Sequence, residues 1–165
     1  MSESVNIIER RKDRIIKTFA SRINFVKEQG VYEKLKGTGL APELIAAHDG
    51  VIELRFVEGE NFLEHFISLK NNLAEQAKCF EMFFNWYKEY RKVTNIALGE
   101  IGFEDFIIAG DHLVCLDFEH CKPGSAEEDI ARFASLLAMY PKGYTAAGLE
   151  SAKLFICMGA EMMSW

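Results

Sequence analysis

The segment CLDFEHCKPGSAEEDIARF, residues 115–133, carries the most informative pattern of the chain. An apolar run ends there at Asp117, and an aromatic residue and a second carboxylate, Glu119, follow at once. After a Pro-Gly break, Ser125 and Glu128 have the spacing of a helix capping box. The segment therefore predicts a short buried strand that carries carboxylates to its end, and a helix that begins directly behind them.

The carboxylates before this strand belong to the same pattern. Residues 106–116 hold two short apolar segments around a Gly-Asp turn, which predicts a β-hairpin. Glu100 and Asp105 precede the hairpin and Asp117 follows it, so we expect the three carboxylates to converge at one edge. Carboxylate oxygens are ligands that Mg²⁺ prefers, and clustered negative charges favour a cation among them. The alternative is that these residues are solvated loop acids.

The predicted elements form a small strand-rich part followed by a larger helical part, which is an α+β organisation. We predict a reduced N-terminal lobe over residues 1–58 and a helical C-terminal lobe over residues 59–165. Its helix at 126–140 is apolar nearly all round, which predicts a central, buried element. The predicted strands are 5–9, 14–19, 106–109, 113–116 and a hairpin within 42–59 that turns at Asp49-Gly50, and the predicted helices are 21–36, 61–67, 68–93, 126–140 and 145–163.

Composition restricts the functional classes. Of the 165 residues, 49% are hydrophobic and 27% charged, which is typical of a folded domain or of two small lobes that share a cleft. The net charge of -6 argues against nucleic-acid binding, which needs a basic surface. Because no apolar stretch approaches about 20 residues, we expect no membrane span and a cytoplasmic protein.

The acids at positions 100 and 105, the hairpin and the D-F-E of residues 117–119 together resemble the catalytic core of the protein-kinase-like superfamily. The resemblance is strongest to its small-molecule branch, the aminoglycoside/choline-kinase-type phosphotransferases and RIO-like kinases. In that branch a D-I-A helix often follows, as it does at residues 129–131. The resemblance covers most of residues 5–140 in order, and implies a two-lobed fold with a truncated β-rich N-lobe and a mostly helical C-lobe.

The resemblance also extends upstream. It implies that Lys17, in RIIKTF, contacts the nucleotide phosphates, with Glu28 as its partner on the following helix. It implies that the backbone of a hinge holds adenine, and that hinge comprises Arg55, Phe56 and Val57. The local patterns agree, because Lys17 and Glu28 each share a face with apolar residues, and each charge can partner the other. The alternative is that both side chains reach water from these faces.

For function, the resemblance implies an ATP- and Mg²⁺-dependent phosphotransferase. Asp117, with Asp105 and Glu119, would be the metal ligands, and Glu100 would orient the hydroxyl of a small-molecule or protein acceptor. Asp129 would hold the catalytic loop by hydrogen bonding to its backbone. The other interpretation of Asp129 is an acid that favours the positive N-terminus of its helix.

The chain departs from the family pattern in three places. Residues 98–100 read LGE where the family usually has H-G-D or H-R-D, and Asp105 replaces the metal-binding Asn. Residues 1–9 contain no glycine, so the glycine-rich phosphate loop is missing. The LGE motif and the missing glycine-rich loop favour an alternative, a pseudokinase that binds nucleotide, metal or a partner without turnover. A third interpretation is an unrelated α+β interaction domain.

The C-terminal segment LFICMGAEMMSW, residues 154–165, is unusually apolar for a chain end. We expect it to pack on the long helix at 68–93. The alternative is a partner surface, such as a homodimer interface.

Overall fold

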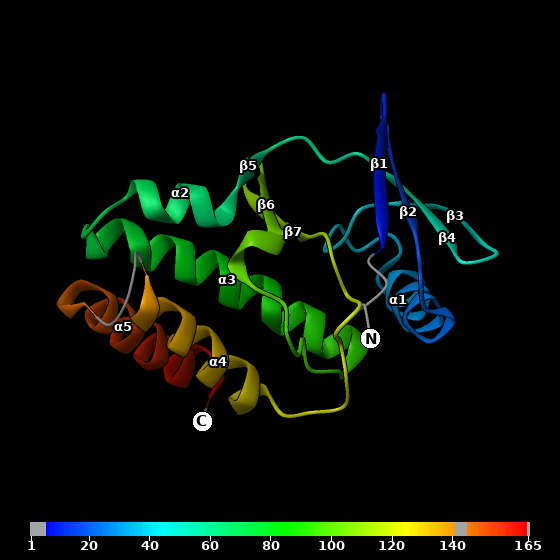
Figure 1. Cartoon of the computed structure of the whole chain (residues 1–165). Helices are drawn as coiled ribbons and strands as arrows, with labels where there is room; N and C mark the ends of the chain where they lie inside the picture. The colour runs from blue at the N-terminus through cyan, green and yellow to red at the C-terminus, as the bar shows by residue number, and fades with distance from the viewer. Residues whose placement is uncertain (1–5, 141–144, 165) are drawn as a thin grey trace, which may run out of the picture.

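The protein, described by a computed structural model, consists of two lobes that lie side by side (Figure 1). The structure describes residues 6–140 and 145–164. The strands are β1 (Ile7–Arg11), β2 (Arg14–Thr18), β3 (Leu44–His48), β4 (Val51–Arg55), β5 (Glu60–Asn61), β6 (Phe106–Ala109) and β7 (His112–Cys115). The helices are α1 (Arg22–Leu35), α2 (Phe62–Ser68), α3 (Leu73–Thr94), α4 (Ala126–Met139) and α5 (Ala146–Met162), with a 3-10 turn, η1 (Phe103–Asp105), before β6.

The N-terminal lobe is an antiparallel sheet with the strand order β1-β2-β4-β3, and α1 lies beside it (Figure 1). The predicted turn at Asp49-Gly50 is confirmed: both residues have positive φ, 48° and 82°, as a tight hairpin turn that matches strand twist requires. Lys17 of β2 lies opposite Ile52 of β4. Strand β2 thus pairs with β1 on one side and with β4 on the other, and this fixes the direction of the Lys17 side chain.

Helix α1 begins and ends where the sequence predicts. The Ser21 side chain accepts a hydrogen bond from the backbone N–H of Asn24, which caps the first turn. The helix stops at Leu35, and Gly37 and Gly39 follow with φ of 78° and 76°. These left-handed conformations suit glycine, because it has no Cβ.

The long helix α3 begins five residues later than the sequence pattern predicts. The predicted start at 68 is wrong because α2 ends there, and Lys70 adopts a positive φ of 53°. Asn72 then caps α3 by accepting a hydrogen bond from the Glu75 N–H. Strand β5 was also not predicted, since its two residues are too short to show a periodic pattern.

Helix α4 is not apolar on all sides. Ser125 caps it, as predicted, by accepting a hydrogen bond from the Glu128 N–H. One face is buried, but Ala131, Ser135 and Met139 on the other face are exposed. The prediction of a central, buried element therefore holds for one face of α4 and is wrong for the other. An exposed helix face that carries small or apolar residues has the same sequence pattern as a buried face. Such faces are common, because much of a protein surface consists of apolar atoms.

The C-terminal lobe is built around aromatic rings. Phe83 of α3 packs edge-to-face on Phe133 of α4 with ring centroids 4.7 Å apart, and Phe155 of α5 lies 4.6 Å from Phe84. Phe155 is fully buried, so the expected packing of the C-terminal segment is confirmed for its described part. The homodimer interface stays a prediction. None of the described helices is long and apolar enough to cross a bilayer.

Candidate active site between the lobes

Lys17 and Glu28 form a buried ion pair. The Lys17 Nζ donates to Glu28 Oε2 at 2.7 Å, and the two side chains are 6% and 0% exposed. The same ammonium donates to Asp117 Oδ1 at 3.0 Å and lies 3.6 Å from Glu119 Oε2. The structure therefore brings together four side chains that the sequence singled out, from β2, α1 and the loop after β7.

Burial and excess negative charge shape the protonation of this cluster. The pKa of Glu28 is raised to about 7, because burial and the charge of Asp117 together outweigh the lowering by Lys17. For Lys17, burial lowers the pKa, but the carboxylates of Glu28 and Asp117 outweigh burial and the pKa is raised. The ammonium is therefore held charged, while the negative charge around it is only partly compensated.

A cavity of about 340 Å³ opens beside the cluster, between the lobes. Its charged lining residues are Lys17, Asp105 and Asp117 on the side of the cluster, together with Arg55 and Glu104. Burial raises the pKa of Asp105, the Gly102 N–H lowers it, and the charge of Asp117 raises it. The remaining wall is largely apolar and includes Ile8, Ile15, Pro42, Leu54, Val57, Ile107 and Leu116. This lining, mostly apolar with an ammonium and carboxylates at the cluster, suits a ligand with a flat apolar part and an anionic tail.

The predicted hinge borders this cavity through Arg55, Phe56 and Val57. The Arg55 N–H donates to the Glu43 carbonyl and the Phe56 N–H to the Asp13 carbonyl, so neither faces the cavity unpaired. Within the described part of the chain, the Val57 N–H has no hydrogen-bond partner. Of the three hinge residues, Val57 is therefore the one whose backbone donor can serve a ligand.

The loop that contains Leu98, Gly99 and Glu100 is held in place by Asp129. Its carboxylate accepts hydrogen bonds from the Leu98 and Gly99 N–H groups, at 2.8 and 3.1 Å, and from the Tyr87 hydroxyl at 2.7 Å. Asp129 is buried, so it acts through the loop backbone rather than as a solvated cap. Gly99 has a φ of 68°, and a Cβ there would lie 2.2 Å from the carbonyl oxygen of His120.

Glu100 lies apart from the other predicted site residues. Its side chain is 73% exposed. The His120 ring lies beside it, with Nδ1 4.0 Å from Glu100 Oε2. Glu100 does not line the cavity that Asp105 and Asp117 share. The predicted convergence therefore holds for two of the three carboxylates.

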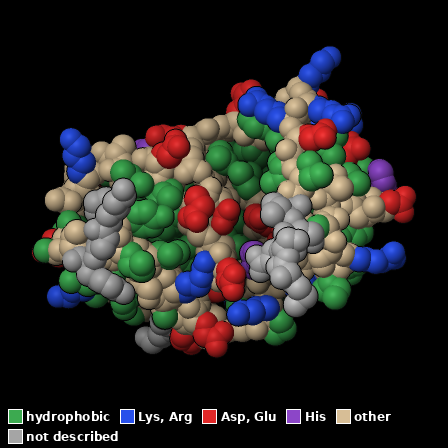
Figure 2. All heavy atoms as spheres, viewed as in Figure 1, with side chains coloured by type: hydrophobic (Ala, Val, Ile, Leu, Met, Phe, Trp, Pro, Cys, Tyr) green, Lys and Arg blue, Asp and Glu red, His purple; other side chains and the backbone are tan. Residues whose placement is uncertain are grey.

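The carboxylates fit a divalent cation. One oxygen from each of Glu28, Asp117 and Glu119 can be chosen so that all three lie within 4.8 Å of one another, and Asp105 faces the same cavity as Asp117. Three carboxylates thus lie within 4 Å of one ammonium, and Asp105 lines the cavity beside them. Hard oxygen donors with uncompensated negative charge are the environment that Mg²⁺ prefers. Figure 2 shows acidic side chains gathered around the junction of the lobes.

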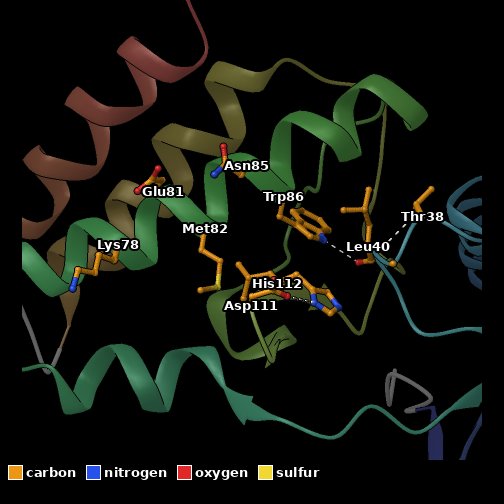
Figure 3. Close-up of a pocket in the computed structure, with 11 residues that line it drawn as sticks. Thr38, Leu40, Lys78, Glu81, Met82, Asn85, Trp86, Asp111 and His112 are labelled. Atoms are coloured by element: carbon orange, nitrogen blue, oxygen red, sulfur yellow. Dashed lines mark hydrogen bonds and ion pairs between the residues drawn. The ribbon is translucent and has the colours of Figure 1, made fainter.

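A second, larger cavity does not share this chemistry. It measures about 610 Å³ and lies between the loop after α1, helix α3 and the β6–β7 turn (Figure 3). The Trp86 indole N–H donates to the Leu40 carbonyl at 2.9 Å, and His112 Nδ1 lies 3.3 Å from Asp111 Oδ1. This cavity contains none of the charged cluster around Lys17, and we therefore assign the candidate site to the cavity beside Lys17.

Three polar residues at the site were not found from the sequence: Glu104, which lines the cavity, Asn24 and Asn6. Asn24 and Asn6 donate side-chain hydrogen bonds to the two oxygens of Glu119. Asn24 precedes Glu28 by four residues on α1, and this shared helix face was a usable signal. Asn6 gave no signal, because its contact depends on where the chain enters β1.

The two lobes, the buried Lys17–Glu28 pair and the hairpin that leads to Asp117 define a protein-kinase-like fold. The chain is similar in structure to a choline/ethanolamine kinase family protein from Mesorhizobium loti, with a TM-score of 0.51 and 14% sequence identity over 99% of this chain and 76% of that chain. No protein-family model and no curated protein sequence matches the chain. The predicted fold is thereby confirmed, and the alternative of an unrelated α+β domain is wrong.

Proposed function

We propose that the protein is an ATP- and Mg²⁺-dependent phosphotransferase that acts on a hydroxyl group. The observation that carries this proposal is the Lys17 ammonium, 2.7 Å from Glu28 and 3.0 Å from Asp117, beside a largely apolar cavity. A lysine fixed in this way supplies a positive charge for phosphate oxygens, and the apolar wall suits a purine ring.

In this proposal, each residue of the site has its own role. The Val57 N–H and the apolar wall bind the base, and Lys17, oriented by Glu28, binds the phosphates. Asp117 and Asp105 would hold Mg²⁺, which supplies charge neutralisation for the transferred phosphoryl group. Glu100 orients the acceptor hydroxyl from the exposed side of its loop. Catalysis then depends mainly on positioning and charge, since phosphoryl transfer needs little covalent chemistry from the protein.

The acceptor is the hydroxyl of a small molecule or of a protein. The acidic junction between the lobes favours a cationic acceptor, because its field attracts positive charge. Choline and ethanolamine, the compounds in the family name of the structural neighbour, are therefore the first acceptors to test. We place the reaction in the cytoplasm, where ATP and Mg²⁺ are abundant.

Thermal melting with ATP, with Mg²⁺ and with both tests nucleotide binding. We expect the two together to raise the midpoint of the wild type by several degrees, as binding to the folded state alone requires. Asp117→Ala should lose the part of the shift that depends on Mg²⁺. An unchanged wild-type midpoint with ATP and Mg²⁺ would contradict the proposal.

A second candidate function is that of a pseudokinase, a nucleotide- or partner-binding module without turnover. The exposed position of Glu100, outside the cavity, favours it. Phosphate-transfer and ATPase assays on the wild type and Glu100→Gln distinguish the two. Turnover that falls about 100-fold in the variant supports a positioning role for Glu100 in catalysis. Binding without any turnover in the wild type supports the pseudokinase.

A further inference from the structure

Three side chains tie the two lobes together next to the cluster. Asn24 Nδ2, on α1, donates to Glu119 Oε1 at 2.5 Å, and Asn6 Nδ2, just before β1, donates to Glu119 Oε2. The Asn6 Oδ1 also accepts a hydrogen bond from the Ala20 N–H at 3.0 Å. Asn6 and Asn24 belong to the N-terminal lobe and Glu119 to the C-terminal lobe. We call these three residues the interlobe latch.

The latch occupies both oxygens of Glu119. The side chain of Glu119 is only 16% exposed, and neither it nor either asparagine lines the cavity between the lobes. Asp117 and Asp105 do line that cavity. Glu119 therefore points to the N-terminal lobe, where its Oε2 also lies 3.6 Å from Lys17 Nζ.

The backbone of the same residue orients Asp117. The Glu119 N–H donates to Asp117 Oδ1 at 2.9 Å, the oxygen that also accepts from Lys17. When the Glu119 side chain is held on both oxygens, its backbone is held as well. Asparagine donors achieve this without adding positive charge, so the negative field around Asp117 is kept.

We propose that Asn6, Asn24 and Glu119 are positioning residues, which fix the loop 117–119 across the lobes so that Asp117 faces the cavity. Glu119 acts through its two amide partners and its own N–H and is not a metal ligand. The inference rests on the proposed function only in assigning the cation to Asp117. The contact of Asn6 also gives a role to the residue directly before β1.

Hydrogen exchange without any ligand tests the latch itself. In Asn24→Ala and in Glu119→Gln we expect the amides of residues 116–121 to exchange about tenfold faster, as the loss of a hydrogen bond to a charged group predicts. The double variant should add little, because both changes remove the same interaction. Gln29→Ala is the matched control, since it removes an exposed amide–carboxylate bond, to Glu33 at 2.8 Å, from the same helix. Unchanged exchange at 116–121 in Asn24→Ala overturns the proposal.

Melting with ADP and increasing Mg²⁺ separates a positioning residue from a ligand. We expect Asn6→Ala, Asn24→Ala and Glu119→Gln to need a similarly raised Mg²⁺ concentration while keeping the maximal shift. If only Glu119→Gln loses the shift and both asparagine variants keep the wild-type response, Glu119 is itself a ligand and the proposal is wrong. If the wild type shows no shift, the proposed function fails, and the exchange measurement still decides the latch.

Discussion

Glu28 combines complete burial with a single cationic partner, and this makes stability depend on pH. Its pKa is raised to about 7 in the folded protein, from an ordinary value of 4.5, because burial and the charge of Asp117 outweigh Lys17. The folded protein therefore holds this proton more tightly than the unfolded chain. Its contribution to stability is complete below about pH 4.5 and is lost as the pH rises through 7.

Urea unfolding of the wild type and Glu28→Gln at pH 5 and pH 8 measures this effect. The shift corresponds to about 3 kcal/mol of unfolding free energy, so the wild type should lose about that much more than the variant between the two pH values. Glutamine keeps the shape and one hydrogen-bond acceptor but does not titrate, which isolates the carboxyl group. Equal losses in both proteins would show that Glu28 ionises normally in the folded state.

At the level of single residues, the sequence predicted the members of the charged cluster, but it did not predict the position of Glu100. Lys17 and Glu28 were predictable because a charge on an apolar face needs a partner, and Asp117 because it ends a buried strand. The placement of Glu100 was not predictable, since a loop residue one position after Gly99 can turn its side chain either way. The contacts of Asn6 and Asn24 join segments more than ninety residues apart from Glu119, so the partner of each could not be predicted, although Asn24 shares a helix face with Glu28.

At the level of elements, two glycines that look alike in sequence have opposite structural roles. Gly99 has a φ of 68° and no room for a Cβ beside the His120 carbonyl. Gly30 lies within α1, and no heavy atom lies within 4 Å of the Cβ position. We expect Gly99→Ala to lower the unfolding free energy by about 2 kcal/mol or more, through left-handed strain and the clash. Gly30→Ala should raise it by about 0.5 to 1 kcal/mol, since alanine favours a helix.

Chemical denaturation of the two variants and the wild type checks both directions at once. Gly99→Ala should also weaken the hydrogen bonds from the Leu98 and Gly99 N–H groups to Asp129, which fast hydrogen exchange at these amides would report. A neutral effect at position 99 would mean that the loop can adopt another conformation. Such a loop would not hold Glu100 in a fixed position.

Most elements were predictable because their ends carry strong local signals. Ser21 and Ser125 cap helices, and Asp49-Gly50 forms the hairpin turn, as their residue types predict. The start of α3 was missed because apolar residues continue at helical spacing through the turn that Lys70 and Asn72 make. Hydrophobic periodicity indicates which face of a helix is apolar, whereas an N-cap residue indicates where the helix begins. For the start of α3, the cap residue Asn72 gives the correct position.

At the level of the whole molecule, the lobes are coupled by packing as well as by charge. The Phe118 ring lies 5.2 Å from Tyr32 of α1, edge to face, and 6.0 Å from Tyr90 of α3, stacked. The Tyr32 hydroxyl donates to the Leu116 carbonyl at 2.7 Å. The D-F-E loop therefore carries an aromatic bridge in its middle, between the carboxylates that form the site. A change in lobe position must move this bridge and Asp117 together.

This bridge predicts how the lobes lose their structure. In the wild type, the most protected amides of β4 and α3 should exchange with the same free energy, as in a single cooperative unit. Phe118→Ala should lower overall stability by about 3 to 5 kcal/mol and leave β4 less protected than α3, because the ring touches both lobes. Phe155→Ala is the matched control, since it removes a ring buried within the C-terminal lobe, and it should lower both free energies equally. If β4 and α3 stay equal in Phe118→Ala, the lobes are coupled mainly by the charged cluster around Lys17. The Lys17→Met variant should then separate them instead.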